Sequence, residues 1–401
     1  MFQNNSPGKI ALNKLLKNKP AMLGLIIILL AVFISLLGAN LRKDKTEMAN
    51  EMMLPIASKP PGFMVKTLLI NKGKEVEEKN FFEKMLFGSQ ENENRIVPIN
   101  SYRYKDDKLI YKEYDDNDTI SLPEKTINLS EIVYGTNTSS YNSTNQQISF
   151  KDSKGNIITH TREELTEIVE KQHINTDTYL LGTDKYGRDM LSRLLAGTIV
   201  SLSVGLIAVL VSLLIGIVMG ALAGYFGGKT DAVITWLVNV IWSVPTLLLV
   251  ISITLLLGKG FSQIFIAVGL TMWVEVARIT RGQFLSLREK EFVEAARALG
   301  FPTWRIIFKH ILPNTWSPLI VISASNFASA ILIEAGLSFL GVGAQPPMPS
   351  WGNMIKEHYG YIVLDKAYLA IIPGVAIMLL VLSFTLLGNG LRDALDTRST
   401  N

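Results

Sequence analysis

The chain alternates between long apolar runs and one extended polar region. Runs such as Ala21–Leu37 and Thr198–Met219 contain no charged residue, whereas residues from about 39 to 190 are rich in lysine, glutamate, asparagine and aspartate. About 20 apolar residues are enough to cross the roughly 30 Å hydrocarbon core of a bilayer as a helix. The core of a soluble enzyme needs no runs of this length. The pattern therefore predicts a multi-spanning membrane protein with one sizeable polar insert.

Six segments are long and apolar enough to span a membrane, and a helix satisfies its own backbone groups there. We predict an all-α polytopic fold with six transmembrane helices and an extracytoplasmic α+β insertion between the first two. Because proline removes a backbone donor, we expect a kink at Pro245 in the third span. The predicted spans are Ala21–Leu37, Thr198–Tyr225, Ala232–Leu257, Ile264–Ile279, Pro318–Val342 and Ala367–Leu387.

The polar insert has the signals of a small folded domain. Four stretches have strand character: Phe63–Ile70, Ile96–Tyr104, Leu109–Tyr114 and Gln147–Phe150. Residues 148–158 predict a hairpin that turns on Lys154, Gly155 and Asn156. Arg162–Lys171 predicts a helix, with Thr161 and Glu164 spaced as a capping box. We expect the asparagine-rich stretch Asn137–Gln147 to be a flexible loop.

Basic residues indicate the topology. Lys9, Lys14, Lys17 and Lys19 precede the first span with no acidic residue among them. They predict a basic flank or an interfacial helix, and both place the N-terminus inside. A cleaved signal peptide is the alternative, although no clear cleavage site follows Leu37 closely. Six spans then place the C-terminus inside and the insert outside. The domains are residues 1–38 (N-terminal helix and first span), 39–190 (insert) and 191–398 (transmembrane core).

A charged, helix-forming stretch, Glu291–Asn314, lies between apolar runs on the predicted inner side. Glutamate, alanine, arginine and leucine favour helix before Gly300, and Pro302 suits the start of a second helix. Pro313 marks a stop or a kink. The pattern predicts two short helices with a glycine break, which together form a knob that a soluble partner can bind.

Composition excludes several chemistries. The chain has no cysteine, and its four histidines (His160, His173, His310 and His358) show no metal-ligand spacing, so we predict no metal site and no cofactor. No nucleophile–base set is present, so we expect no enzyme activity. Residues 223–230 fit a loose phosphate-binding pattern, but they end a membrane helix instead of following a strand, and a glycine-rich turn is the better interpretation. The net charge of +4 is small, and we expect no nucleic-acid partner.

A few polar and small residues occur within the apolar spans. Glu334 and Asn326 in the fifth span are candidates for a pathway or gating role, with helix packing as the alternative for Glu334. Glu275 and Arg278 predict a local helix pair. Glycines recur along one side of the second span and predict close helix packing: Gly205, Gly216, Gly220 and Gly224.

Four motifs resemble one family, the C-type permease subunits of oligopeptide and dipeptide ABC importers. Glu294-Ala295-Ala296, then Gly300, then Leu312-Pro313 resembles the family's EAA loop, and we call residues 284–315 the EAA loop. Residues 181–197 resemble the signature LGTDxxGRDxLSRLLxG, here called the GRD motif. Residues 334–352 resemble EAxLSFLGLGxQPPxPSWG, and residues 387–396 resemble the family's C-terminal ending. Three positions depart from the family's usual residues: Ile199 for arginine, His310 for isoleucine and Thr397 for proline.

The resemblance implies a permease of the bacterial cytoplasmic membrane that works with partner subunits. These are a homologous B-type permease, two cytoplasmic ATP-binding subunits that use ATP, and an extracytoplasmic substrate-binding protein. The EAA loop would dock into an ATPase through Glu291, Glu294, Ala295, Ala296, Gly300, Leu312 and Pro313. The GRD motif would stand at the outer surface, and its site residues are Gly182, Asp184, Gly187, Arg188, Asp189 and Arg193. Gly182 and Gly187 suggest a turn, and we expect Arg188, Asp189 and Arg193 to pair locally there.

Three other functions compete with a peptide importer. A secondary transporter driven by an ion gradient predicts midplane charges and internal repeats, and the sequence shows few charges and no obvious repeat. A surface receptor would make the insert the working part. A nickel-type permease of the same family has the same motifs, so the sequence identifies neither the solute nor the role of the insert.

Overall fold

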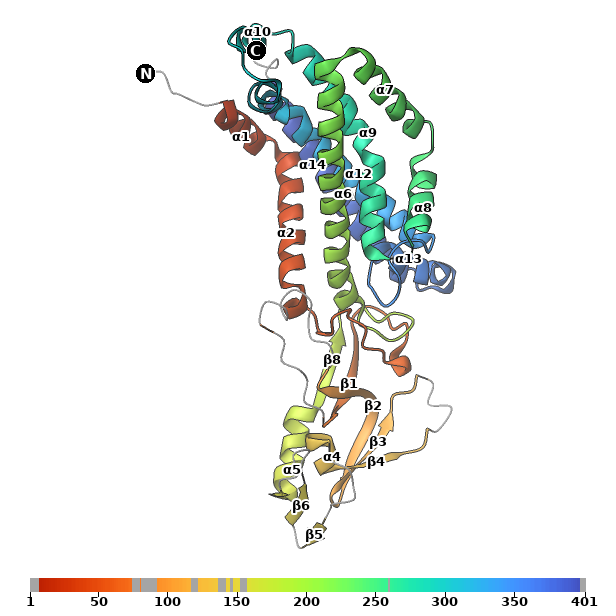
Figure 1. Ribbon diagram of the computed structural model, residues 1–401. Coiled ribbons are helices and arrows are strands. Elements are labelled where there is room, and N and C mark those ends of the chain that lie inside the picture. The colour runs from red at the N-terminus through yellow and green to blue at the C-terminus, as the bar shows by residue number, and fades with distance from the viewer. Residues whose placement is uncertain are drawn as a thin grey trace, which may run out of the picture. The chain divides into compact units, whose positions relative to one another are not determined.

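The computed structural model of this chain contains two compact units (Figure 1). The helical unit comprises residues 1–35, 197–360 and 370–401, and the α+β unit comprises residues 36–196 and 361–369. The structure describes residues 7–73, 80, 92–116, 122–135, 142–144, 147–151, 157–258 and 260–396.

Apolar helices dominate the helical unit, because side chains that face lipid and side chains that face the protein interior are both hydrophobic. Five helices are long and apolar enough to cross a membrane, and the number rises to six if one bent pair counts as a single span. The helices are α1 (Pro7–Lys17), α2 (Lys19–Leu41), α6 (Met190–Phe226), α7 (Gly228–Trp242), α8 (Thr246–Leu257), α9 (Phe261–Leu287), α10 (Glu291–Ala298), α11 (Thr303–Arg305), α12 (Trp316–Phe339), α13 (Trp351–His358) and α14 (Tyr368–Leu395).

The bent pair corrects the prediction for the third span. A kink at Pro245 was expected, but α7 and α8 meet at an angle of 93°. Pro245 is the N-cap of α8 and has an extended backbone, and a residue before proline is also driven away from the helical region. Asp231 at the start of α7 forms a two-pronged ion pair with Arg281 of α9 (2.5 and 2.6 Å). This pair fixes α7 along α9.

Glycines bring α6 into close contact with its neighbours, as the sequence predicted. A Cβ atom at Gly216 would lie 2.5 Å from Val276, and one at Gly224 would lie 2.5 Å from Phe284. Gly220 faces Ala277 and Thr280 in the same way. These contacts leave no room for a side chain, so the glycines set the distance between α6 and α9.

The α+β unit contains two antiparallel sheets. The larger sheet has the order β4-β3-β2-β1-β8, and the smaller one has the order β5-β6-β7. The strands are β1 (Phe63–Asn71), β2 (Asn94–Lys105), β3 (Lys108–Glu113), β4 (Lys125–Asn128), β5 (Asn142–Thr144), β6 (Gln147–Lys151), β7 (Ile157–Thr161) and β8 (Ile174–Tyr179). Helix α4 (Leu129–Tyr134), helix α5 (Arg162–Ile168) and a π-helical turn (Val169–His173) accompany the sheets.

The larger of two apolar clusters in the described part of the α+β unit packs its helices on the larger sheet. Leu68 of β1 and Ile99 of β2 pack with Leu129 of α4 and Leu165 of α5, and all four side chains are at most 1% exposed. Helices α4 and α5 lie on one side of the larger sheet (Figure 1). Alternate positions of each strand therefore face this core, which is why the strand pattern was visible in the sequence.

Most local predictions for the insert agree with the structure. All four predicted strands are present as β1, β2, β3 and β6, and the capping box of Thr161 and Glu164 is formed. Strands β6 and β7 pair as the predicted hairpin, and its turn lies outside the described residues. The predicted flexible loop is wrong in part, because Asn142–Thr144 forms β5 and pairs with β6.

Candidate functional site: the EAA loop and two polar motifs

A glycine cap separates the two helices of the EAA loop. The N–H of Phe301 donates to the carbonyl of Ala296 (3.1 Å), and the N–H of Gly300 donates to that of Arg297 (2.9 Å). This double closure is a Schellman motif, which requires a left-handed residue after the C-cap. Gly300 supplies that residue, with φ of +72°. The glycine of the motif therefore turns the chain, and Pro302 then caps the next helix, as predicted.

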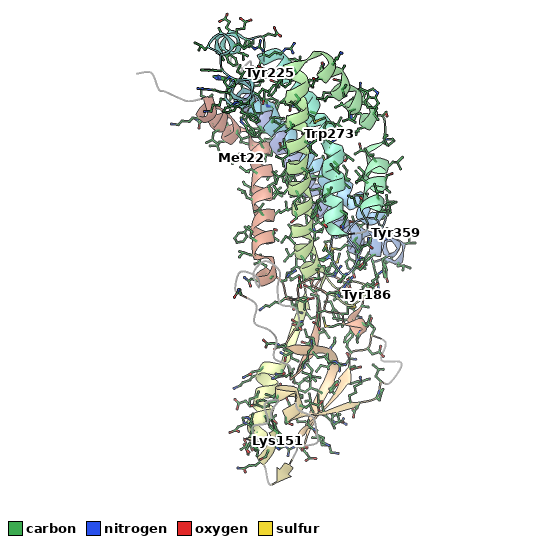
Figure 2. All side chains as sticks on the ribbon, in the orientation of Figure 1. Met22, Lys151, Tyr186, Tyr225, Trp273 and Tyr359 are labelled. Carbon is green, nitrogen blue, oxygen red and sulfur yellow. The ribbon has the colours of Figure 1, made fainter. Side chains whose placement is uncertain are left out.

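One side of the EAA loop packs in an apolar cluster with the membrane helices. Val293 and Ala296 of α10 pack with Phe284 of α9, and all three are buried. Other members are Ala221, Ile306, Ile307 and Ile311, with Tyr225, Leu287, Phe301 and Leu312 half-buried around them. Tyr225 lies near the end of α6 (Figure 2). Ala296 thus permits close approach of α10 to its own membrane helices.

The opposite face of the EAA loop exposes large apolar side chains. Leu299 is 71% exposed, Trp304 is 61% exposed and Phe308 is 59% exposed. Glu291, Glu294, Ala295 and Pro313 are exposed as well. These three apolar residues were not among the predicted site residues, although an aromatic residue two positions after a helix-starting proline in a charged stretch was a usable signal. Neighbouring exposed apolar groups of this kind are typical of an interaction surface.

The second helix of the EAA loop does not stop at Pro313. From α11 the chain continues through a π-helical turn (Ile306–Ile311) and a 3₁₀ turn (Leu312–Thr315) into α12. Proline is tolerated there because it stands in the first turn of a new helical segment. The result is one helical run of 37 residues, Thr303–Phe339. The EAA loop is therefore continuous with the helix that contains Asn326 and Glu334.

His310 occupies a definite place in the loop. Its ring stacks on Phe301, with centroids 5.8 Å apart and an interplanar angle of 16°. Phe301 also lies beneath the guanidinium of Arg305 at 4.1 Å. The flat imidazole therefore stacks on an aromatic ring at this position of the loop.

Arg278 has a different partner from the predicted one. Its guanidinium stacks on the ring of Trp242, 3.6 Å from the centroid. Within the described ranges, no ion pair joins it to Glu275. The sequence could not reveal this contact, because Trp242 is at the end of another helix.

Glu334 is hydrogen-bonded next to the start of a proline-rich loop. Its carboxylate, 1% exposed, accepts from the hydroxyl of Ser338 (2.7 Å). The Ser338 hydroxyl accepts from the N–H of Ala344 (3.1 Å), and at the far end of the loop Ser350 caps α13 by accepting from the N–H of Asn353 (3.1 Å). Glu334 and Ser338 therefore fix the end of α12 where the loop begins.

Two buried polar atoms on α12 have no hydrogen-bond partner among the described residues: Oε2 of Glu334 and the amide nitrogen of Asn326. Asn326 is 2% exposed. An unpaired buried polar group costs free energy, so its presence in an apolar helix calls for a functional or assembly reason.

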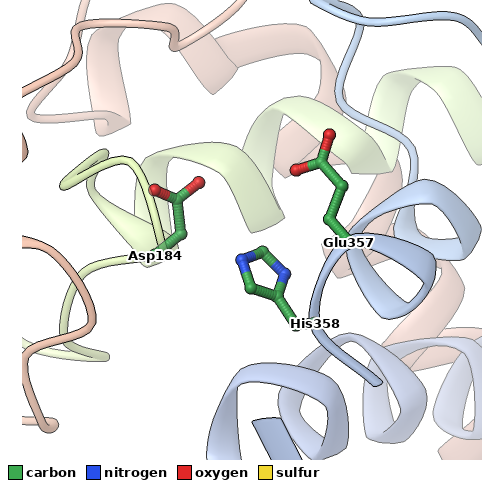
Figure 3. A group of neighbouring side chains, drawn as sticks. All are labelled: Asp184, Glu357 and His358. Carbon is green, nitrogen blue, oxygen red and sulfur yellow. The ribbon is translucent and has the colours of Figure 1, made fainter. Parts of the chain in front are cut away.

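The GRD motif forms a buried network of hydrogen bonds and ion pairs within the α+β unit. Asp184 is fully buried (Figure 3), and its carboxylate accepts from the backbone N–H groups of Tyr186 (2.8 Å) and Arg188 (3.0 Å). The Arg188 side chain, 2% exposed, donates to the same carboxylate (2.5 Å) and to Asn50 (2.9 Å). Gly182 and Gly187 both have φ of +76° and form the turns around this pair. Arg193, 1% exposed, has its Nε 3.8 Å from Asp184.

Asp189 plays a different part from the predicted one. Pairing of Arg188, Asp189 and Arg193 at the surface was expected, but Asp189 accepts from the N–H (2.9 Å) and hydroxyl (2.5 Å) of Ser192. It is thus the N-cap of α6. Burial raises the pKa of Asp189, and the Ser192 hydrogen bonds act in the opposite direction. Asp184 is the carboxylate that pairs with Arg188 instead.

The four histidines have separate local partners. The ring of His160 contacts Tyr134 (2.7 Å), and His173 contacts the carbonyl of Leu69 (2.7 Å). His358 lies beside Glu357 on the last turn of α13 (Figure 3) and contacts the carbonyl of Met354 (2.7 Å). Gly227 and Gly228, part of the loose phosphate-binding pattern, have positive φ and join α6 directly to α7.

Comparison with known proteins identifies the family. The model of the binding-protein-dependent transport system inner membrane component matches residues 216–401, and that of the N-terminal TM domain of oligopeptide transport permease C matches residues 6–61. The chain is 42% identical over 223 residues to a glutathione transport system permease protein of Pectobacterium atrosepticum, covering 56% of this chain and 74% of that protein. The chain belongs to the family of binding-protein-dependent transport permeases. A dipeptide transport system permease protein of Alkalihalophilus pseudofirmus is also 42% identical, over 54% of this chain and 71% of the relative.

Solved structures resemble this permease over its helices. A chain of the MetNI methionine ABC transporter has a TM-score of 0.43 and 21% identity, over 52% of this chain and 98% of that chain. A chain of an amino acid ABC transporter has a TM-score of 0.40 and 18% identity, over 51% of this chain and 94% of that chain. The family model and the two named relatives, together with the apolar helices, show that the permease is a multi-pass inner membrane component of a transport system. Both named relatives are transport proteins.

Proposed function

We propose that this permease forms half of the pathway of an ATP-driven importer for peptides. Relatives named for dipeptide and glutathione transport support the solute class. The other half would be a homologous B-type permease, with two ATP-binding subunits inside and a substrate-binding protein outside. The N-terminus, the C-terminus and the EAA loop would then face the cytoplasm.

The observation that carries this proposal is the two-sided EAA loop. Val293 and Ala296 pack against Phe284 of the membrane helices. The side chains of Leu299, Trp304 and Phe308 are exposed to solvent. An ATPase that binds the exposed face would move a rigid body. The helical run from α11 to α12 has no interruption, so that movement would pass directly to the helix that contains Asn326 and Glu334.

Leu299→Ser tests the docking face. The side chain is 71% exposed, so the fold should keep its stability to within about 0.5 kcal/mol. If Leu299 is an anchor of the interface, its loss should weaken ATPase binding by about 2 kcal/mol, roughly 30-fold. The measurement is the affinity of the purified permease complex for its ATPase subunits. Ile157→Ser, at a residue that is 72% exposed in the α+β unit, is the matched control. Equal affinity in both variants would remove Leu299 from the interface.

Glu334→Gln tests the role of the hydrogen bond from Ser338 to Glu334 at the end of α12. We propose that this bond, together with the bond from the N–H of Ala344 to Ser338, holds the outer loop closed in one state of the transport cycle. A hydrogen bond to a charged group contributes about 1.5–3 kcal/mol, so uptake of a radiolabelled dipeptide into proteoliposomes should fall at least about tenfold. ATP hydrolysis should continue, because the EAA loop is unchanged. Glu275→Gln, at an exposed carboxylate of α9, is the control. Unchanged uptake by the Glu334 variant would exclude a role in transport.

A further inference from the structure

A groove opens on the α+β unit beside the apolar core, and most of the residues that line it are polar or charged. It has a volume of about 740 Å³, within the range of small-ligand pockets. Tyr102 and Tyr104 of β2 line it on one side, and the outer face of α5 with its π-helical extension lines the other. The residues on the helical side are Thr161, Arg162, Glu163, Thr166, Glu167, Glu170 and Lys171.

Two tyrosine hydroxyls hold one carboxylate of the groove in a fixed position. Tyr102 donates to one oxygen of Glu170 (2.7 Å), and Tyr104 donates to the other (2.6 Å). Burial and the bond to Glu170 raise the pKa of Tyr102 to about 12 and also raise that of Tyr104. Both hydroxyls therefore remain protonated donors at neutral pH. Glu170 belongs to the π-helical turn Val169–His173, a rare geometry that is often found at functional sites.

The charges of the groove are not balanced. Its carboxylates outnumber its cations by one. Lys171 pairs with Glu167, and Arg162 lies 3.9 Å from Asp106 outside the groove. Within the described part of the chain, neither Glu163 nor Glu170 forms an ion pair. Two carboxylates therefore line the groove without an ion pair among the described residues, Glu170 held by two tyrosine hydroxyls and Glu163 exposed. Lys66 of β1 is a cation near the rings, and its Nζ lies 5.5 Å from the Tyr102 centroid.

Packing accounts for the two rings but not for the carboxylate between them and the helix. Tyr102 and Tyr104 pack against the same apolar core as the buried Leu165 and Val169. Their hydroxyls hold the exposed Glu170 on the groove side, where the core needs no charge. A metal ion is a poor match, because among the described residues the three glutamates do not converge as metal ligands do. Carboxylates next to aromatic rings instead suit an organic cation, which gains both charge and cation–π attraction.

We propose that the groove between β2 and α5 binds an alkyl-ammonium or guanidinium group, as found in basic peptides and in free polyamines. Glu170 and Glu163 supply the negative charge, and Tyr102 and Tyr104 supply the aromatic wall. This site is independent of the pathway between the membrane helices. It gives the insert a binding role of its own, whatever the imported solute is.

Calorimetry on the full-length permease in neutral-lipid nanodiscs tests this site. The probes are trilysine, spermidine and N-acetyl-trialanine amide, at low ionic strength and without ATPases or binding protein. Trilysine should bind and the uncharged capped peptide should not. Glu170→Gln, which keeps an acceptor oxygen but removes the charge, should weaken trilysine binding about tenfold. Glu124→Gln is the control, because Glu124 is an exposed carboxylate outside the groove.

A second variant distinguishes a loss of binding from a loss of folding. Glu163 is exposed and belongs to no hydrogen-bond network of the groove, so Glu163→Lys should fold and should abolish trilysine binding. Spermidine binding at equal strength supports the site and identifies the free polyamine as a sufficient ligand. Equal trilysine affinity in wild type and both groove variants, or equal binding of the capped peptide, overturns the proposal. Neither result depends on uptake measurements, so failure here is separate from failure of the transport function.

Discussion

Gly300→Pro is expected to separate the permease from its ATPases while it still inserts into the membrane. Proline fixes φ near −65°, whereas Gly300 has φ of +72° and donates its N–H to Arg297. The Schellman closure of α10 cannot form, at a cost of about 3 kcal/mol or more in local stability. Leu299 and Trp304 then lose their fixed relation to each other, because Gly300 lies between them in the chain. Co-purification with the ATPase subunits and ATP-dependent uptake should both fall to background.

Two further variants test whether Gly300→Pro acts through the left-handed backbone conformation at this position. Gly300→Ala places a side chain in the left-handed region at a cost of about 1–2 kcal/mol, so coupling should be reduced but not lost. Gly282→Ala is the control, because Gly282 lies in α9 with no atom near its missing Cβ and with no positive φ. Normal ATPase association and normal uptake in Gly300→Pro would rule out the EAA loop as the coupling element.

Asp184→Asn is expected to cause the largest loss of stability in the α+β unit. The variant keeps the shape of the side chain but leaves the Arg188 guanidinium, 2% exposed, without its anionic partner. Removing one partner of a buried ion pair costs about 3–5 kcal/mol. Chemical denaturation of the detergent-solubilised protein, followed by far-UV circular dichroism, measures the loss. Asn at this position still accepts backbone hydrogen bonds, so the change isolates the charge.

The matched control is a surface pair of the same unit. Glu124→Gln breaks an ion pair with Arg103 in which both side chains are at least half exposed, so it should cost no more than about 1 kcal/mol. The double variant Asp184→Leu with Arg188→Met removes both charges of this pair, but the Arg193 guanidinium stays buried and two backbone N–H groups lose their acceptor, so it should recover only part of the lost stability. If Asp184→Asn is as stable as the surface control, the buried pair of Asp184 and Arg188 does not stabilise the α+β unit.

Local patterns made much of this fold predictable. The strands of the insert were visible because alternate residues face one core, and the capping box was visible because its two residues are three positions apart. The break at Gly300 followed from the conformational needs of a helix end. Hydropathy found the spans but not their direction, so the 93° bend between α7 and α8 could not be distinguished from a kink.

The candidate site was predictable in position but not in contacts. Asp189 is spaced equally well for an ion pair and for a helix cap, and only the start of α6 at Met190 decides between them. Trp242 and Arg278 are far apart in sequence, so no local pattern could pair them. The exposure of Leu299 depends on which face of α10 meets the membrane helices, and that orientation comes from tertiary packing.

The Schellman cap of α10 has a consequence for how such permeases could diversify. The turn is closed by backbone groups and by one glycine, so its shape does not depend on the side chains at Leu299, Trp304 and Phe308. Those three positions can change without disturbing the cluster beneath them. In the docking role proposed above, the loop would act as an adaptor in which a constant frame presents a variable surface, and the choice of ATPase could evolve separately from the membrane core.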